Sequence, residues 1–203
     1  TVSVVMYKGF GISNTDIALF TSWLYLPWTI KPLWSPLVDL LGTRRRWIWI
    51  MQLLIGAAFA GLALTAPLPQ SVQWTLVFFW LMAFSSATHD IAADGYYMLA
   101  LDPSRQAFFV GVRTLFYRLS AMFASGPFLL WARRMIEHSG GPVRGWSIAI
   151  AGLAGIMGVL GAWHPLSLPK PEPDRPGEAR RVGELLREFI ATFTTFFQKP
   201  GIG

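Results

Sequence analysis

Four polar side chains recur along one apolar stretch at helical spacing. They are Ser86, Asp90, Asp94 and Tyr97, separated by four, four and three residues. Such intervals keep side chains on one face of a helix. Carboxylates on that face can bind a proton or a cationic group of a solute. His89 points about a quarter-turn from Asp90, and is either a group that titrates near neutral pH or a hydrogen-bonded packing residue.

A second apolar stretch carries basic and aromatic counterparts. Arg113 and Tyr117 lie on one stripe of a predicted helix, and Arg118 lies on another. The two stretches are joined by a short turn, so residues equally far from the turn lie at equal depth. This register predicts that Asp90 pairs with Arg118 and that Asp94 lies near Arg113. The pairs either bind solute and couple protons, which we favour, or only hold two helices in register.

The stretches that carry these residues are long enough to cross a membrane. Hydrophobic residues make up 53% of the 203-residue chain and charged residues 14%, whereas soluble domains carry about 25% charged residues. A spanning helix needs about 20 apolar residues. Five stretches qualify, and they are 17–38, 47–66, 72–101, 107–132 and 145–163. An all-α membrane protein is therefore predicted, with membrane lipid as its surroundings.

Three regions follow from this pattern. Residues 1–6 resemble the tail of an earlier spanning helix, residues 7–166 hold the five spans, and residues 167–203 form a linker rich in proline and charge. Within the linker, 178–197 has an apolar face rich in phenylalanine. This segment is predicted to be an amphipathic helix that lies on the membrane surface or packs on another protein surface.

Basic residues set the predicted orientation. One side of the membrane collects Arg44, Arg45, Arg46, Arg105 and the basic residues of the linker, whereas the other collects Lys8, Arg133, Arg134 and Arg144. The side richer in lysine and arginine is predicted to be cytoplasmic. The 133–144 loop does not fit this rule, because it carries three arginines on the other side. Lys31 either extends to the cytoplasmic interface or takes part in gating. Asp39 and the three arginines after it are either interfacial anchors or a gating cluster.

Several classes of function are not supported. There is no cysteine, no metal-ligand spacing and no glycine-rich phosphate loop after a strand. No catalytic constellation is visible, so neither an enzyme nor a cofactor is predicted. The formal charge of +6 sits in short clusters at the ends of apolar blocks, which is typical of membrane orientation and not of nucleic-acid binding.

Three motifs resemble one family. KPLWSPLVD at 31–39, followed by Gly42 and the arginines, resembles the loop after the second helix of AmpG-like permeases of the major facilitator superfamily. HDIAADGY at 89–96 resembles their fourth-helix signature, and YRL at 117–119 their fifth-helix signature. Two positions depart from the family pattern: His89 stands at a glutamine position, and Arg113 at a small or apolar one.

The resemblance implies twelve helices in two halves, of which this chain would supply helices two to six and the central linker. On this resemblance, the C-terminal half of the same protein would be a partner that this sequence does not include. It also implies a proton-coupled symporter in the bacterial inner membrane that imports muropeptides, or in relatives siderophores or acetyl-CoA. The rival hypothesis is a scaffold or receptor subunit that does not transport.

Overall fold

The computed structural model describes residues 2–171 and 174, together with residues 183, 184, 187, 190, 191 and 194. The side chains of residues 39 and 40 are not among the described parts. The helices are α1 (Val2–Gly9), α2 (Asn14–Trp23), α3 (Leu26–Thr29), the 3-10 turn η1 (Lys31–Leu33), α4 (Ser35–Leu41), α5 (Arg44–Thr65), α6 (Ser71–Ala100), α7 (Pro103–Ser125), α8 (Pro127–Ser139) and α9 (Pro142–Ser167). The predicted amphipathic helix at 178–197 lies mostly outside the described residues.

Four helical runs in the described part of the chain are long and apolar enough to cross a membrane. They are α5, α6, the combined run Pro103–Ser139 and α9, with 22, 30, 37 and 26 residues. Each exceeds the roughly 20 residues that a bilayer core requires. The described residues contain no strand. The prediction of an all-α membrane protein is therefore confirmed.

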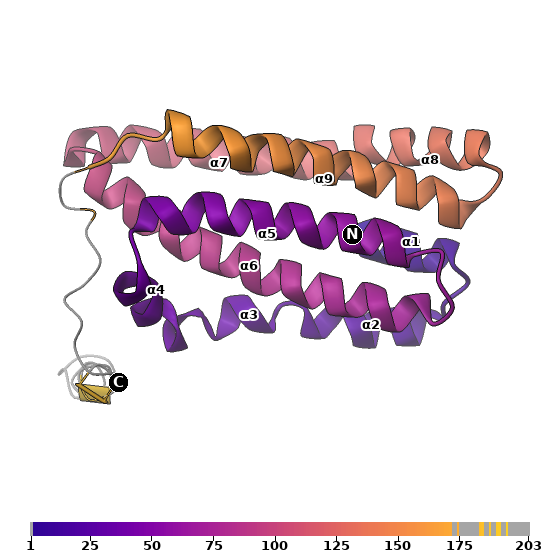
Figure 1. Ribbon diagram of the computed structural model, residues 1–203, viewed down its shortest axis with the longest axis horizontal. Coiled ribbons are helices and arrows are strands. Elements are labelled where there is room, and N and C mark those ends of the chain that lie inside the picture. The colour runs from indigo at the N-terminus through magenta and orange to yellow at the C-terminus, as the bar shows by residue number, and fades with distance from the viewer. Residues whose placement is uncertain are drawn as a thin grey trace.

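The segment predicted to span at 17–38 is not one continuous helix. It is divided into α2, α3, η1 and α4, and prolines occupy the first or second position of the last three. Proline lacks a backbone donor and clashes with the preceding turn, so each one ends a helix and permits a new one to start. The broken segment still runs along the bundle beside α6 (Figure 1).

Two other element boundaries differ from the prediction. The first helix continues to Gly9, three residues past the predicted tail. The predicted 133–144 loop is largely helical: α8 continues the direction of α7 beyond a break at Gly126 and Pro127. Arg133, one of the basic residues that did not fit the predicted orientation, pairs with Glu137 one turn later at 3.0 Å. That acid offsets its charge locally.

The bundle is organised around α5, which lies between α6 and α9 (Figure 1). One cluster of buried residues, which includes Tyr7, Phe128 and Trp146, fills the end where α8 turns into α9. A second, built on Val38, Ile48, Ala92 and Tyr96, fills the opposite end. By contrast, none of the α7 residues is buried. The apolar surface of α7 therefore faces lipid or further protein.

Candidate functional site

Two acidic and two basic side chains form one ion-pair network inside the spanning region. Lys31 Nζ is paired with Asp90 Oδ2. The Arg113 guanidinium donates to Asp90 Oδ1 at 2.7 Å through one nitrogen and to Asp94 through the other. Asp90 is therefore shared by a lysine and an arginine. We call Lys31, Asp90, Asp94 and Arg113 the charge network.

Three elements position the charge network. Asp90 and Asp94 are one turn apart on α6, so a two-ended guanidinium from α7 reaches both. Lys31 opens η1, where the broken 17–38 segment bends beside α6. The interfacial position considered for Lys31 is therefore wrong: its ammonium lies against Asp90. Sequence spacing could not show this, because the bend depends on three proline breaks.

The charge network is partly open. The side chains of Lys31, Asp90, Asp94 and Arg113 are 23%, 34%, 40% and 58% exposed. Charges within a membrane span are costly unless they are paired or wet, and these charges are paired. Two carboxylates and two cations balance one another. Proton binding by either carboxylate would leave an excess of positive charge that can bind an anionic solute.

The predicted pairing of Asp90 with Arg118 is wrong, whereas Asp94 and Arg113 do pair. Pairing at equal depth requires a tightly packed hairpin of α6 and α7, but no residue of α7 is buried. Near the turn, Tyr97 and Gln106 join the two helices by hydrogen bonds, and deeper in the bundle the long Arg113 side chain reaches across to both carboxylates. Arg118 and Tyr117 are exposed, and Arg118 makes no ion pair among the described residues. Both remain free to contact a solute.

Two polar groups that the sequence did not single out lie on the other side of α6. His164 on α9 and Gln52 on α5 are joined by a hydrogen bond of 2.5 Å between Nδ1 and Oε1. Near them, His89 Nε2 is buried and makes no hydrogen bond to the described residues. The available signal was Gln52, an amide within a stretch free of charge.

The arginines predicted to gate the protein contact the linker. The Asp174 carboxylate accepts hydrogen bonds from the backbone nitrogens of Arg44 at 2.7 Å and Arg45 at 3.0 Å. It thereby caps α5, where a negative charge is favoured by the helix dipole. The Arg45 side chain donates to the carbonyls of Leu168, at 2.9 Å, and Pro165.

The end of α6 also takes part in the contact between α5 and the linker. The Tyr96 hydroxyl donates to the Pro169 carbonyl at 3.0 Å, and the Arg44 side chain crosses α6 to the Gly95 carbonyl at 3.4 Å. A Cβ at Gly95 would lie within 3 Å of the Arg44 side chain, so Arg44 would have to shift to accommodate any larger residue there. We call Arg44, Arg45, Tyr96 and Asp174 the linker clamp.

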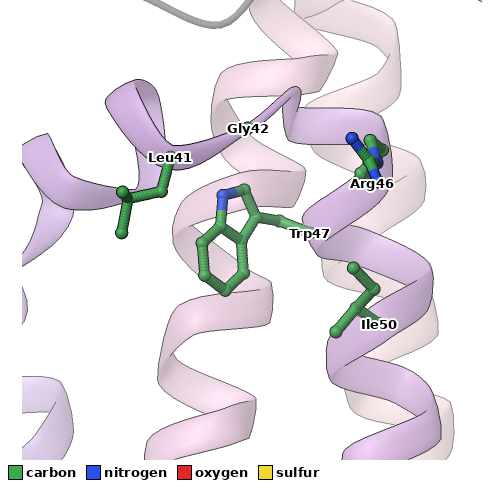
Figure 2. A pocket seen from close by; sticks show the side chains of 5 residues that line it. All are labelled: Leu41, Gly42, Arg46, Trp47 and Ile50. Atoms are coloured by element: carbon green, nitrogen blue, oxygen red, sulfur yellow. The ribbon is translucent and has the colours of Figure 1, made fainter. Parts of the chain in front are cut away.

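Arg46 lies apart from both groups. It borders a cavity of about 280 Å³ with Leu41, Gly42, Trp47 and Ile50. Figure 2 shows the Trp47 indole standing between Leu41 and the α5 helix, with Arg46 on the far side. A gating role for Arg46 and for Asp39 therefore stays a prediction. No group of three metal-ligating side chains occurs among the described residues.

Comparison with known families matches this arrangement to membrane permeases. A sequence profile of the BT1 family matches residues 1–125, more than half of the chain. The chain belongs to the BT1 family. The matched stretch contains the whole charge network as well as Tyr117 and Arg118.

Two curated relatives agree with this assignment. The anhydromuropeptide permeases of Escherichia coli K12 and of Escherichia coli O157:H7 are each 31% identical over 127 residues. The alignment covers 59% of this chain and 26% of each relative, so the chain spans only a part of their length. No solved structure matches the chain significantly.

Family membership and helix architecture together define the general class of this BT1-family chain. It is a multi-pass membrane protein of the permease class, and its resemblance to AmpG-like permeases is confirmed. Helices of this length and composition are suited to a lipid environment. The solute, the coupling ion and the role of each network residue are matters for proposal.

Proposed function

We propose that this chain forms the N-terminal half of a proton-coupled secondary transporter that imports a muropeptide-like solute across the bacterial inner membrane. The observation that carries the proposal is the charge network on α6, α7 and η1. A scaffold would be expected to bury its charges dry, because wetting them gains nothing for packing. Here all four side chains of the network are partly exposed.

Proton binding and solute binding can be linked through Asp90. When this carboxylate is ionised, it holds both Lys31 and Arg113. When it binds a proton, its attraction for both cations falls and they become available to a solute carboxylate. The peptide part of a muropeptide carries such carboxylates. The same group would thus link the transported proton to the transported solute.

The exposed residues of α7 supply further contacts in this proposal. Tyr117 is 74% exposed, and an aromatic face suits the apolar face of a sugar ring. Arg118 lies next to it and offers five hydrogen-bond donors to a carboxylate. Asp94 would hold Arg113 in place when Asp90 releases it, since the two remain paired.

Uptake into vesicles tests the proposed function. The full-length protein, reconstituted in liposomes, should accumulate labelled anhydromuropeptide when the outside is more acidic than the inside. Collapse of the pH gradient should stop accumulation, because the proton supplies the driving force. Accumulation of a siderophore or acetyl-CoA instead would show that the solute assignment is wrong. Absence of transport for all three solutes would favour the scaffold hypothesis.

The orientation is part of the proposal: the linker lies in the cytoplasm and the turn after α8 in the periplasm. The chain has no cysteine, so a single introduced cysteine can be labelled without background. Both Lys170 and His138 are exposed. In intact spheroplasts, an impermeant maleimide should label His138→Cys and should reach Lys170→Cys only after permeabilisation. The opposite labelling pattern would invert the topology.

A further inference from the structure

His89 is the residue before Asp90 on α6 and points about a quarter-turn away from it, on another face of the helix. It shares a helical face with Phe78, eleven residues earlier, and with the buried Ala92, three residues later. Phe78 packs against Gly61 of α5, so His89 faces the interior of the bundle. Its Nε2 is buried without a hydrogen bond among the described residues. A buried polar atom of this kind is usually satisfied by an internal water.

A second histidine lies close to this face. The His164 Nδ1 atom is 2.5 Å from Gln52 Oε1. Because an amide oxygen can only accept, His164 Nδ1 carries the hydrogen and its Nε2 keeps a lone pair when the ring is neutral. Gln52 therefore orients His164 so that its second nitrogen can accept a proton.

The register of the helices brings the two histidines to similar depth. Contacts of Gly61 with Phe78 and of Arg44 with Gly95 align α5 with α6. In this alignment Gln52 is level with position 87, two residues from His89, which is about 3 Å along the helix axis. His89 interacts electrostatically with both Asp90 and His164.

We propose that His89 and His164 form a proton-release route from Asp90 to the cytoplasmic end of the bundle. This inference rests on the proposed proton coupling and adds its path. The protonated Asp90 carboxyl gives its proton, through a water, to the imidazole of His89. The resulting imidazolium passes one proton to Nε2 of His164, which releases it to water. Asp90 regains its negative charge and again pairs with Lys31 and Arg113.

The surroundings fit this direction of transfer. Lys31 and Arg113 remain beside Asp90 to pair with its carboxylate once the proton has left. α5 contributes the uncharged Gln52 at this depth, and His164 is the titratable group from α9. His164 lies three residues before the end of α9, next to Pro165, whose carbonyl is held by Arg45 of the linker clamp. The route thus ends at the side proposed to be cytoplasmic.

Two transport modes of the full-length protein separate proton release from solute binding. Proton-driven accumulation of labelled anhydromuropeptide requires release of the proton inside. Counterflow at equal pH exchanges solute for solute and needs no net proton release. His89→Gln and His164→Gln should each lower accumulation by about tenfold or more and leave counterflow within about twofold of the parent. The matched control is His138→Gln, an exposed histidine on α8, which should change neither rate.

Each other outcome has a defined meaning. Unchanged accumulation in both variants, or equal loss of accumulation and counterflow in protein with unchanged thermal stability, would overturn the release route. If His89→Gln fails to fold, the release route is tested by accumulation and counterflow in His164→Gln alone, since that site is partly exposed. If the parent itself shows counterflow without proton-driven accumulation, the proposed proton coupling fails. If it shows neither, the solute assignment fails.

Discussion

Replacement of Asp90 by asparagine should abolish proton-driven uptake in the full-length protein, with a loss of about 100-fold or more. Asparagine keeps the size of the side chain and one of the two oxygens that accept from Lys31 and Arg113, but it cannot bind a proton as a carboxylate does. The fold should therefore survive. The measurement is accumulation of labelled anhydromuropeptide in proteoliposomes under an imposed pH gradient.

The matched control is Asp102→Asn. Asp102 is 77% exposed at the start of α7 and only 3.9 Å from Arg105, an arrangement that contributes little in water. This variant should transport at the parent rate. If Asp90→Asn transports as well as Asp102→Asn, the carboxylate of Asp90 carries no proton, and the charge network serves packing alone.

Replacement of Arg113 by glutamine should destabilise the protein more than any other single change in the charge network. Arg113 holds Asp90 and Asp94 together. Its loss leaves the two carboxylates with Lys31, which pairs with Asp90, as the remaining cation of the network. Like charges one turn apart repel each other. We expect a lower yield and a melting temperature lower by several degrees, with the effect limited by the 58% exposure of Arg113. Thermal unfolding in detergent measures it.

A compensating change distinguishes repulsion from other defects. The double variant Arg113→Gln with Asp94→Asn removes one charge of each sign and should recover most of the lost stability. Arg118→Gln, which removes an exposed arginine that has no ion pair among the described residues, should leave the melting temperature unchanged. A larger loss of stability in Arg118→Gln than in Arg113→Gln would favour the equal-depth pairing of Asp90 with Arg118 after all.

The membrane architecture could be predicted because the bilayer imposes it. Every backbone donor and acceptor in the hydrocarbon must be paired, so a long apolar run has to be helical. The pairing of Asp94 with Arg113 followed from helical depth in the same way. Spacing failed where α7 departs from α6, because no pattern within either segment records how far apart two helices stand. Arg118 was misplaced for this reason.

Contacts between distant segments were the least predictable. Lys31 reaches Asp90 only because proline breaks bend the 17–38 segment, and their combined effect on direction cannot be deduced from residue types. The hydrogen bond between Gln52 and His164 joins residues 112 positions apart. A charge-free stretch drew no attention to Gln52, although a single amide among apolar residues is a signal that can be searched for.

The linker clamp extends the helical unit beyond the point where the apolar sequence stops. Composition suggests a boundary near residue 166, where the apolar sequence stops. However, Asp174 accepts from the first two backbone nitrogens of α5, beside the cap that Thr43 provides. The partner of the Tyr96 hydroxyl is the carbonyl of Pro169. A chimera joined to a second half at residue 166 would lose both contacts and expose the first turn of α5, with its three arginines, at a dipole end that disfavours them. When halves are exchanged between related permeases, the junction should lie after Asp174. The first residues of the linker form part of the helical bundle that precedes them.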